Sequence, residues 1–181
     1  VMTPVTEPVK LAAITNNLAL VAAGTATVAK LSIFTETFIY TCYLWVGGVG
    51  ATLSLVLLMC FSAKSKELKA LGRACLVPGI FNINEPVVFG AIAWNPLLMV
   101  PMWLQGIILP LMTWLFTKVI PFAPIPRIQF ELWYCPYPIS TFISTQGSIT
   151  GVLFAIITFL VSGLIWFPFL KAYDAQKVKE E

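Results

Sequence analysis

Three long apolar stretches organise the chain. Residues 39–62, 96–117 and 149–170 are mostly apolar, and none of the three contains a charged side chain. A helix needs about 20 predominantly apolar residues to cross a bilayer core, and one charge at its centre costs roughly 2.5–3.5 kcal/mol on insertion. The pattern therefore predicts three full transmembrane helices at these positions.

Two further apolar stretches, 71–93 and 119–148, are interrupted too often to be simple spans. The first contains Pro78-Gly79, Asn82-Ile83-Asn84-Glu85-Pro86 and Gly90, and the second contains five prolines. Proline removes a backbone donor, and broken backbone at membrane depth is tolerated only where protein or water satisfies its polar groups. Both stretches are predicted to be re-entrant hairpins, which are typical of secondary-transporter sites.

The first thirty residues show a different pattern. Apolar side chains recur at helical spacing between residues 11 and 21, whereas Asn16 and Asn17 fall on the other face. This spacing is typical of an amphipathic helix, and Gly24 suits its C-terminal end. We expect an amphipathic connecting helix within residues 1–30.

Basic residues follow the first and the last predicted span. The two clusters are Lys64, Lys66, Lys69 and Arg73, and Lys171, Lys177 and Lys179. Because short loops rich in Lys and Arg stay in the cytoplasm, both clusters and the polar tail 176–181 are predicted to be cytoplasmic. The expected fold class is an all-α integral membrane protein with three spans, two re-entrant hairpins and an N-terminal amphipathic helix.

The composition agrees with a lipid environment and excludes several classes of function. Hydrophobic residues make up 59% of the chain and charged residues only 10%, against about 25% charged in soluble domains. The net charge of +3 is small and no basic stretch is interleaved with aromatic residues, so a nucleic-acid partner is not expected. The four cysteines form no CxxC pair and histidine is absent, so neither a metal site nor a cofactor is expected.

Glu85 is the first candidate for chemistry. It is an ionisable residue within an apolar, proline-broken stretch, which makes it a functional-site candidate by default. A carboxylate accepts hydrogen bonds strongly from hydroxyl groups, and Asn82 and Asn84 add amide donors and acceptors beside it. Glu85 could therefore bind a sugar hydroxyl and act as a base towards it. The alternative is a structural hairpin tip in which Glu85 bonds to backbone amides.

The second candidate is the aromatic loop that runs from Leu132 to Pro138. Trp133 and Tyr134 lie here between prolines, and aromatic faces pack against the apolar faces of sugars while their polar tips bond hydroxyls. The alternative is an interfacial aromatic belt, since Trp and Tyr are enriched at headgroup depth.

A third candidate is the small-residue cluster inside the first predicted span. Gly48, Gly50 and Thr52 belong to the run Val46-Gly47-Gly48-Val49-Gly50-Ala51-Thr52. Small residues permit close approach of a ligand or of a neighbouring helix. Helix packing is the favoured interpretation of such a cluster taken alone.

Taken together, these motifs resemble the membrane component, enzyme IIC, of the lactose/cellobiose/diacetylchitobiose phosphotransferase family. The resemblance rests on the glycine run, on Leu76 through Val87 with its Asn-Ile-Asn-Glu-Pro motif, on Trp133 through Ser140, and on Pro168 through Asp174. It covers nearly the whole chain in the same order. Residues 31–175 would then form the C-terminal substrate-binding half of the permease, within a longer protein whose upstream part carries a Gly-Ile-His-Gly motif.

The resemblance implies a function as well as a fold. Members are dimeric, multi-pass permeases of the bacterial cell membrane and form the sugar-binding component of a phosphoenolpyruvate-dependent phosphotransferase. A phosphorylated cysteine on the IIB component delivers phosphate to the 6-hydroxyl of the bound disaccharide. The family's hydroxyl-binding glutamate falls on Glu85 and its sugar-stacking tryptophan on Trp133. The family's glycines near the site fall on Gly47, Gly48 and Gly50, with Thr52 close by.

Two other functions remain open from the residues alone. A secondary transporter or facilitator would use Glu85 to carry a proton or to hold the loop, and would release unmodified sugar. A structural membrane fragment would serve only as an assembly surface.

Overall fold

The computed structural model describes residues 3–181. Val1 and Met2, which begin the predicted segment 1–30, lie outside the described residues. Within residues 3–181 all regular secondary structure is helical, with no β-strand, as the predicted all-α class requires. The helices are α1 (Thr3–Ala22), the π-helix η1 (Thr37–Tyr43), α2 (Leu53–Phe61), α3 (Lys66–Ile80), α4 (Glu85–Val87), the π-helix η2 (Val88–Ile92), α5 (Pro96–Trp114), the π-helix η3 (Leu115–Val119), α6 (Ile139–Ser144) and α7 (Ile149–Glu180).

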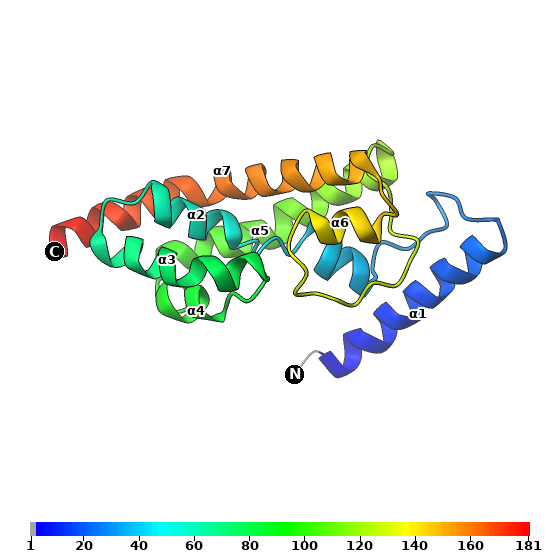
Figure 1. Cartoon of the computed structure of the whole chain (residues 1–181), viewed down its shortest axis with the longest axis horizontal. Coiled ribbons are helices and arrows are strands. Elements are labelled where there is room, and N and C mark those ends of the chain that lie inside the picture. Colours follow the sequence, from blue (N-terminus) through cyan, green and yellow to red (C-terminus); the bar gives the residue numbers. More distant parts are fainter. Residues whose placement is uncertain (1–2) are drawn as a thin grey trace.

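Two helical segments are long and apolar enough to cross a membrane. They are Pro96–Val119, with 24 residues, and Ile149–Glu180, with 32 residues. Helix α5 begins after Asn95, whose side chain accepts a hydrogen bond from the Leu97 amide, with Pro96 at the first position, a place where its missing donor costs nothing. In Figure 1, α7 runs along most of the length of the molecule and α5 lies beside it.

Helix α7 is longer than the sequence pattern predicts. The apolar run ends at Leu170, but the helix continues through the charged residues to Glu180. The residues 176–181, predicted as a separate tail, are therefore helical except for the last. The reason is that Asp174 and Glu181 bond to residues 64–67 and hold this last part of α7 against the start of α3.

The predicted span 39–62 is not one uninterrupted helix. It consists of η1, an irregular turn and α2, and the turn covers residues 44–52. Gly47, Gly48 and Gly50 have φ angles of +83°, +94° and +82°, which lie outside the helical region. Hydrophobicity alone does not reveal such a break, because the residues in the turn are as apolar as those in the helices.

The stretch 71–93, predicted to be a re-entrant hairpin, contains the end of α3, a turn and the short helices α4 and η2. Helix α3 continues through Pro78 to Ile80, so Pro78-Gly79 does not break it as expected. The turn falls instead at residues 81–84, where Asn82 has a φ angle of +62°. Pro86 then occupies the first turn of α4, and η2 extends the second arm to Ile92.

The second predicted hairpin, 119–148, is mostly irregular. After η3 the chain follows an extended path with turns as far as Pro138, and only α6 is helical. Figure 1 shows this long loop, in yellow-green and yellow, wrapping around α6 and η1. Helix α6 packs against η1 and α7, and its Thr141 hydroxyl donates to the Cys42 carbonyl at 2.7 Å.

Helix α1 is present where an amphipathic helix was expected, and Gly24, with a φ angle of +68°, follows its end. The expected orientation of Asn17 is wrong, however, because this side chain is buried. Its amide donates to the Ser32 carbonyl at 2.8 Å and its oxygen accepts from the Ser32 amide at 2.7 Å. The loop after α1 folds back and supplies both partners, which spacing within the helix does not reveal.

The main cluster of buried apolar residues joins α2, α5 and α7. Leu55 and Met59 of α2 pack with Leu98 of α5 and Trp166 of α7 in the largest cluster of buried apolar residues. Much of the outer surface is apolar as well: Trp94 is 87% and Phe61 81% exposed. Such extended apolar surface marks contact with lipid or with further protein.

Candidate functional site

The glycine turn at residues 44–52 forms the base of the candidate site. Gly48 lies so close to Asn84 that a Cβ built on it would be 2.5 Å from the Asn84 side chain. Its φ angle of +94° is also one that residues with a Cβ rarely adopt. The run of small residues therefore serves a tight turn against the hairpin tip, and not the helix packing that such a run favours when it is considered alone.

Asn82 joins three segments that are distant in the sequence. Its Oδ1 accepts from the Gly47 amide at 2.8 Å, and its Nδ2 donates to the carbonyls of Trp133 at 2.7 Å and Cys135 at 3.1 Å. The side chain is 6% exposed, so these bonds satisfy a buried amide. Both amide hydrogens are engaged, and Asn82 consequently acts as a clamp between the turn, the hairpin tip and the aromatic loop.

Asn84 makes the second link between the hairpin tip and the turn. Its Nδ2 donates to the Val49 carbonyl at 2.8 Å, and its side chain is also buried. No partner for its Oδ1 occurs within residues 3–181. Asn84 therefore combines an anchored donor with a free acceptor beside Glu85.

Glu85 is the first residue of α4, directly after the non-helical turn. Its side chain is exposed, and no residue in the described part of the chain forms a salt bridge or hydrogen bond with its carboxylate. The alternative expectation was a carboxylate bonded to backbone amides of the hairpin tip. No such hydrogen bond to Glu85 occurs within residues 3–181. The carboxylate is thus held on a bonded tip with its acceptor oxygens available.

Trp133 and Tyr134 stand next to this tip. Their rings meet edge to face, with centroids 5.7 Å apart and planes at 85°, and each side chain is about half exposed. The Trp133 backbone is fixed through its carbonyl by Asn82. The clamp therefore sets the position of an aromatic pair relative to Glu85, although the two lie in separate parts of the sequence.

Thr52 is close to the site but turned into the protein. Its hydroxyl donates to the Gly47 carbonyl at 2.6 Å and its side chain is fully buried. The hydrogen bond closes the glycine turn. We therefore assign Thr52 to the support of the turn, together with Gly50, whose carbonyl accepts from the indole of Trp166 at 3.2 Å.

Sequence reasoning missed the residues of α5 and α7 that support the glycine turn through hydrogen bonds. Ser162 of α7 donates to the Ala51 carbonyl at 2.9 Å and lies 2.7 Å from the Ser54 hydroxyl. Gln105 of α5 donates to the carbonyl and the hydroxyl of Ser162 at 3.0 and 2.9 Å. The sequence signal that could have found Gln105 and Ser162 was their polarity. An amide and a hydroxyl within otherwise apolar spans need hydrogen-bond partners inside the protein.

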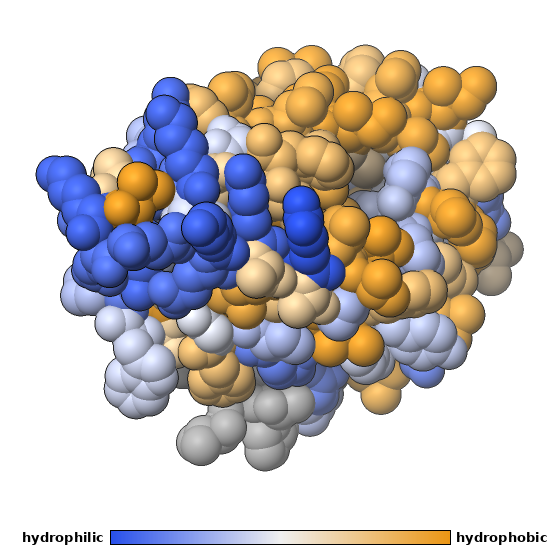
Figure 2. All heavy atoms as spheres, turned by 60° about the vertical axis from the view of Figure 1, so that its left-hand side comes forward, coloured by the Kyte–Doolittle hydropathy of each residue, from blue (hydrophilic) through white to orange (hydrophobic). Residues whose placement is uncertain are grey.

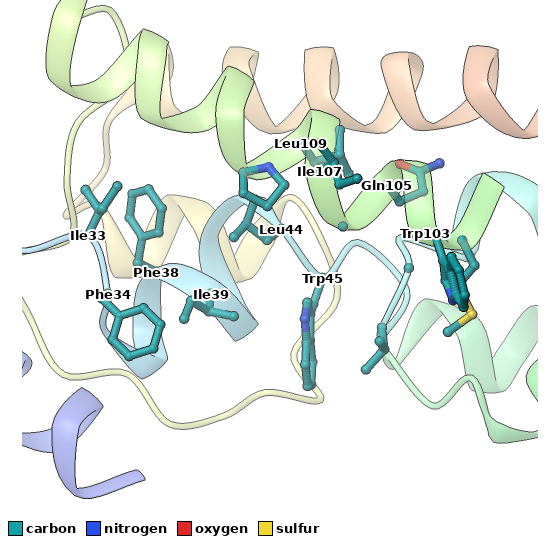
Figure 3. A pocket seen from close by; sticks show the side chains of 15 residues that line it. Ile33, Phe34, Phe38, Ile39, Leu44, Trp45, Trp103, Gln105, Ile107 and Leu109 are labelled. Carbon is teal, nitrogen blue, oxygen red and sulfur yellow. The ribbon is translucent and has the colours of Figure 1, made fainter. Parts of the chain in front are cut away.

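A cavity lies between η1, the glycine turn and α5. It is a groove of about 770 Å³, lined mainly by apolar residues of η1, the turn and α5. Figure 3 shows Leu44 and Trp45 between the η1 side chains and Trp103 of α5. Val49 and Gly50 line the groove, whereas Glu85 and Trp133 do not. The groove and the polar site therefore share only the wall formed by the turn.

A metal-binding arrangement is not found in the described part of the chain, where no group of three His, Cys, Asp or Glu side chains is suitably placed. Cys135 contributes its carbonyl to the Asn82 clamp and is a free thiol. The chemistry available at the site is consequently that of a carboxylate, an amide oxygen and two aromatic rings.

Comparison with known proteins relates these features to one family. The family described as "Phosphotransferase system, EIIC" matches residues 1–106. The putative permease IIC component YwbA of Bacillus subtilis is 40% identical over 154 residues, which are 83% of this chain and 34% of that protein. The cellobiose-specific EIIC component of Geobacillus stearothermophilus is 38% identical over 151 residues, with 83% and 33% covered.

A lactose-specific EIICB component of Staphylococcus aureus is 32% identical over 183 residues, which cover 100% of this chain and 31% of that protein. The crystal structure of the transporter ChbC, the IIC component of an N,N'-diacetylchitobiose-specific phosphotransferase system, superposes with a TM-score of 0.90 at 34% identity. The superposition covers 98% of this chain and 40% of ChbC. The chain spans about a third of the length of the curated relatives it matches. Since the family match covers more than half of its residues, this chain belongs to the EIIC family of the phosphotransferase system.

Proposed function

We propose that this chain forms the sugar-binding part of a phosphotransferase-system permease for a β-linked disaccharide of the cellobiose, lactose or diacetylchitobiose type. The observation that carries the proposal is the Asn82 clamp, which brings the carboxylate-bearing tip and the Trp133–Tyr134 pair together. The relatives whose names specify cellobiose, lactose and diacetylchitobiose support this substrate class.

In the proposed complex the sugar lies between the aromatic pair and the hairpin tip. One face of a sugar ring packs against Trp133, which supplies apolar contact with little loss of side-chain freedom. The 6-hydroxyl donates to the Glu85 carboxylate, and the free Oδ1 of Asn84 accepts from a neighbouring hydroxyl. The clamp holds these groups in place before the sugar arrives, so little ordering is lost on binding.

Phosphate transfer follows from the same arrangement. Glu85 accepts the proton of the 6-hydroxyl while the hydroxyl oxygen attacks the phosphorus carried by the cysteine of the IIB component. The new O–P bond forms as the S–P bond breaks, and the thiolate leaves on IIB. A base aligned with its substrate in this way contributes roughly 10²–10⁴-fold to a rate.

The finer topology belongs to the same proposal. The tip at residues 81–84 and the loop 119–148 enter the membrane as re-entrant segments, while Pro96–Val119 and Ile149–Glu180 cross it. The broken segment formed by η1, the turn and α2 completes the third crossing. The charged end of α7 faces the cytoplasm, and the whole protein is a multi-pass homodimer in the bacterial cell membrane.

The proposal is tested with Glu85→Gln in the intact permease, with IIB and the phosphoryl-donor proteins present. We expect sugar phosphorylation to fall at least 100-fold, while sugar affinity changes much less because the amide still accepts a hydrogen bond. Glu131→Gln is the matched control, since Glu131 is an exposed acid two residues from Trp133, and it should retain full activity.

Two outcomes would contradict the proposal. Near-normal phosphorylation by the Glu85→Gln variant would remove the role of the carboxylate. Accumulation of unmodified sugar in vesicles without any phosphoryl donor would favour the secondary transporter, in which uptake and phosphorylation are not coupled.

A further inference from the structure

The end of the molecule where α3 begins and α7 ends gathers most of the basic side chains. Figure 2 shows hydrophilic residues concentrated on this side, next to a broad hydrophobic surface. We define the basic rim as the six cations here that have no salt bridge within residues 3–181: Lys64, Lys66, Lys69, Arg73, Lys171 and Lys179.

Two acids at this end, the buried Asp174 and the exposed Glu181, accept hydrogen bonds from the start of α3. Asp174 is buried and accepts from the amides of Lys64, at 2.8 and 2.9 Å, and of Ser65, at 2.8 Å. Glu181 accepts from the Ser65 hydroxyl at 2.6 Å and from the amides of Lys66 and Glu67 at 3.1 and 3.0 Å. These carboxylates occupy the N-terminus of α3, so an external anion cannot bind there.

The other two acids share one cation. Lys177 forms salt bridges with Glu67 at 3.1 Å and with Glu180 at 3.3 Å. Lys177 is therefore excluded from the rim, and neither carboxylate forms a salt bridge with a rim residue. The rim thus retains six cations without a salt bridge in the described part of the chain, five of them exposed and Lys69 partly buried.

The exposed face of α3 changes character along its length. Lys66, Lys69 and Arg73 follow one another at helical spacing, and the next exposed residue of the same face, Val77, is apolar and 64% exposed. One helical turn, about 5.4 Å, separates Arg73 from Val77. This face passes from basic to apolar side chains within that distance.

Helix α7 shows the same change at the same end. Leu164 and Phe167 are exposed and apolar, and Lys171 follows one turn later. The Lys171 ammonium lies over the Phe167 ring, 5.3 Å from its centroid. Because α3 and α7 are in contact, the two transitions from apolar to basic define one border across neighbouring helices.

We propose that the basic rim binds the headgroups of anionic phospholipids at the membrane surface. Cations placed directly beside a lipid-facing apolar surface are within reach of lipid phosphates, and clusters of four to eight Lys and Arg residues next to a membrane helix attract anionic lipids. An acidic protein would be the other partner for such charges. The lipid is favoured because the rim shares its helix faces with exposed apolar side chains, which a water-soluble protein would leave uncovered.

The test uses the intact protein in nanodiscs of phosphatidylcholine, with and without phosphatidylglycerol, and native mass spectrometry to count retained lipids. We expect retention of phosphatidylglycerol over phosphatidylcholine, and a preference roughly 10- to 30-fold weaker in Lys69→Gln/Arg73→Gln, since each basic residue near the surface contributes several-fold. The charge-conserving variant Lys69→Arg/Arg73→Lys should keep the preference.

Lys30→Gln/Arg127→Gln is the matched control, because it also removes one lysine and one arginine charge, but from exposed positions outside the rim. Equal lipid preference in the two double variants would overturn the proposal. Loss of IIB binding with unchanged lipid retention would instead assign the rim to a protein partner. Displacement of the lipid by inorganic phosphate at equal concentration would reduce the rim to an anion site that is not specific for a membrane.

Discussion

The side-chain amide of Asn82 donates to the backbone carbonyl of Trp133 at 2.7 Å, across 51 residues of sequence. This hydrogen bond connects the tip that carries Glu85 to the aromatic loop. The same side chain also accepts from the Gly47 amide. One buried residue thereby fixes the relative positions of the groups that we propose for binding and for proton transfer.

Substitution of Asn82 should therefore affect both stability and sugar binding. In Asn82→Ala the Gly47 amide loses its acceptor and the Trp133 carbonyl loses its donor, at a cost of about 1–3 kcal/mol for each buried group left unsatisfied. We expect a lower unfolding temperature and at least tenfold weaker sugar binding, measured by thermal denaturation and calorimetry. Asn16→Ala, at an exposed position of α1, is the control. Unchanged sugar affinity in a folded Asn82→Ala protein would argue against the clamp.

Gly48 should not tolerate a side chain. In Gly48→Ala the new Cβ meets the Asn84 side chain, and alanine at a φ angle of +94° is strained. We expect the free energy of unfolding to fall by about 2 kcal/mol or more. We also expect the hydrogen bond from the Asn84 side chain to the Val49 carbonyl to be disrupted. The comparison is Gly106→Ala in α5, where nothing lies within 4 Å of the added atom and alanine favours the helix. If the two variants have similar melting temperatures, the close approach of turn and tip is not important for stability.

Trp166 should contribute to the stability of the fold through the hydrogen bond of its indole N–H as well as through its packing. Trp166→Phe removes the donor to the Gly50 carbonyl and leaves a small void in a fully buried position. We expect destabilisation of about 2–4 kcal/mol from the unsatisfied carbonyl and the void. Trp94→Phe is matched in chemistry but lies at a position that is 87% exposed, and should change stability little. Chemical denaturation of both variants in the same detergent provides the measurement.

The end of α7 should respond to acid. Hydrogen bonds from the Glu67 amide, the Ser65 hydroxyl and the Lys66 amide lower the pKa of the Glu181 carboxyl to about 2. Since this pKa is below the ordinary value of about 4.3, the contacts contribute fully above about pH 4.3 and are lost as the pH falls through 2. A carboxyl NMR titration should give the low midpoint, and Ser65→Ala should move it upward. An unshifted midpoint near 4 in the unmodified protein would mean that Glu181 does not cap α3.

Part of this architecture follows from local sequence. The stretch 96–117 lies within the helical segment Pro96–Val119, where a long apolar run without an internal glycine turn coincides with a helix long enough to cross a membrane. The break between residues 81 and 84 was expected from the asparagines and Pro86, and Pro86 does begin α4. The same reasoning failed at Pro78, through which α3 continues for two more residues before the chain turns.

The expected site residues lie close together, but their roles separate only in three dimensions. The sequence could propose Asn82, Asn84 and Glu85 as equal candidates because all three are polar in an apolar region. Packing gives Asn82 two backbone carbonyls and one amide as partners, leaves Glu85 exposed, and turns Thr52 inward. Residue type alone does not show which polar groups are already hydrogen-bonded within the protein and which remain available to a ligand.

The sequence by itself determined the helical class, the lipid-compatible surface and the motif that carries Glu85, since these depend on composition and on neighbours within a few turns of helix. Only the tertiary structure decided that the first apolar stretch bends at Gly47–Gly50, that Ser162 and Trp166 support this turn, and that the aromatic loop meets the hairpin tip. The physical reason is that a buried polar group must find its partners wherever the fold brings them, and here those partners lie 35 to 116 residues away.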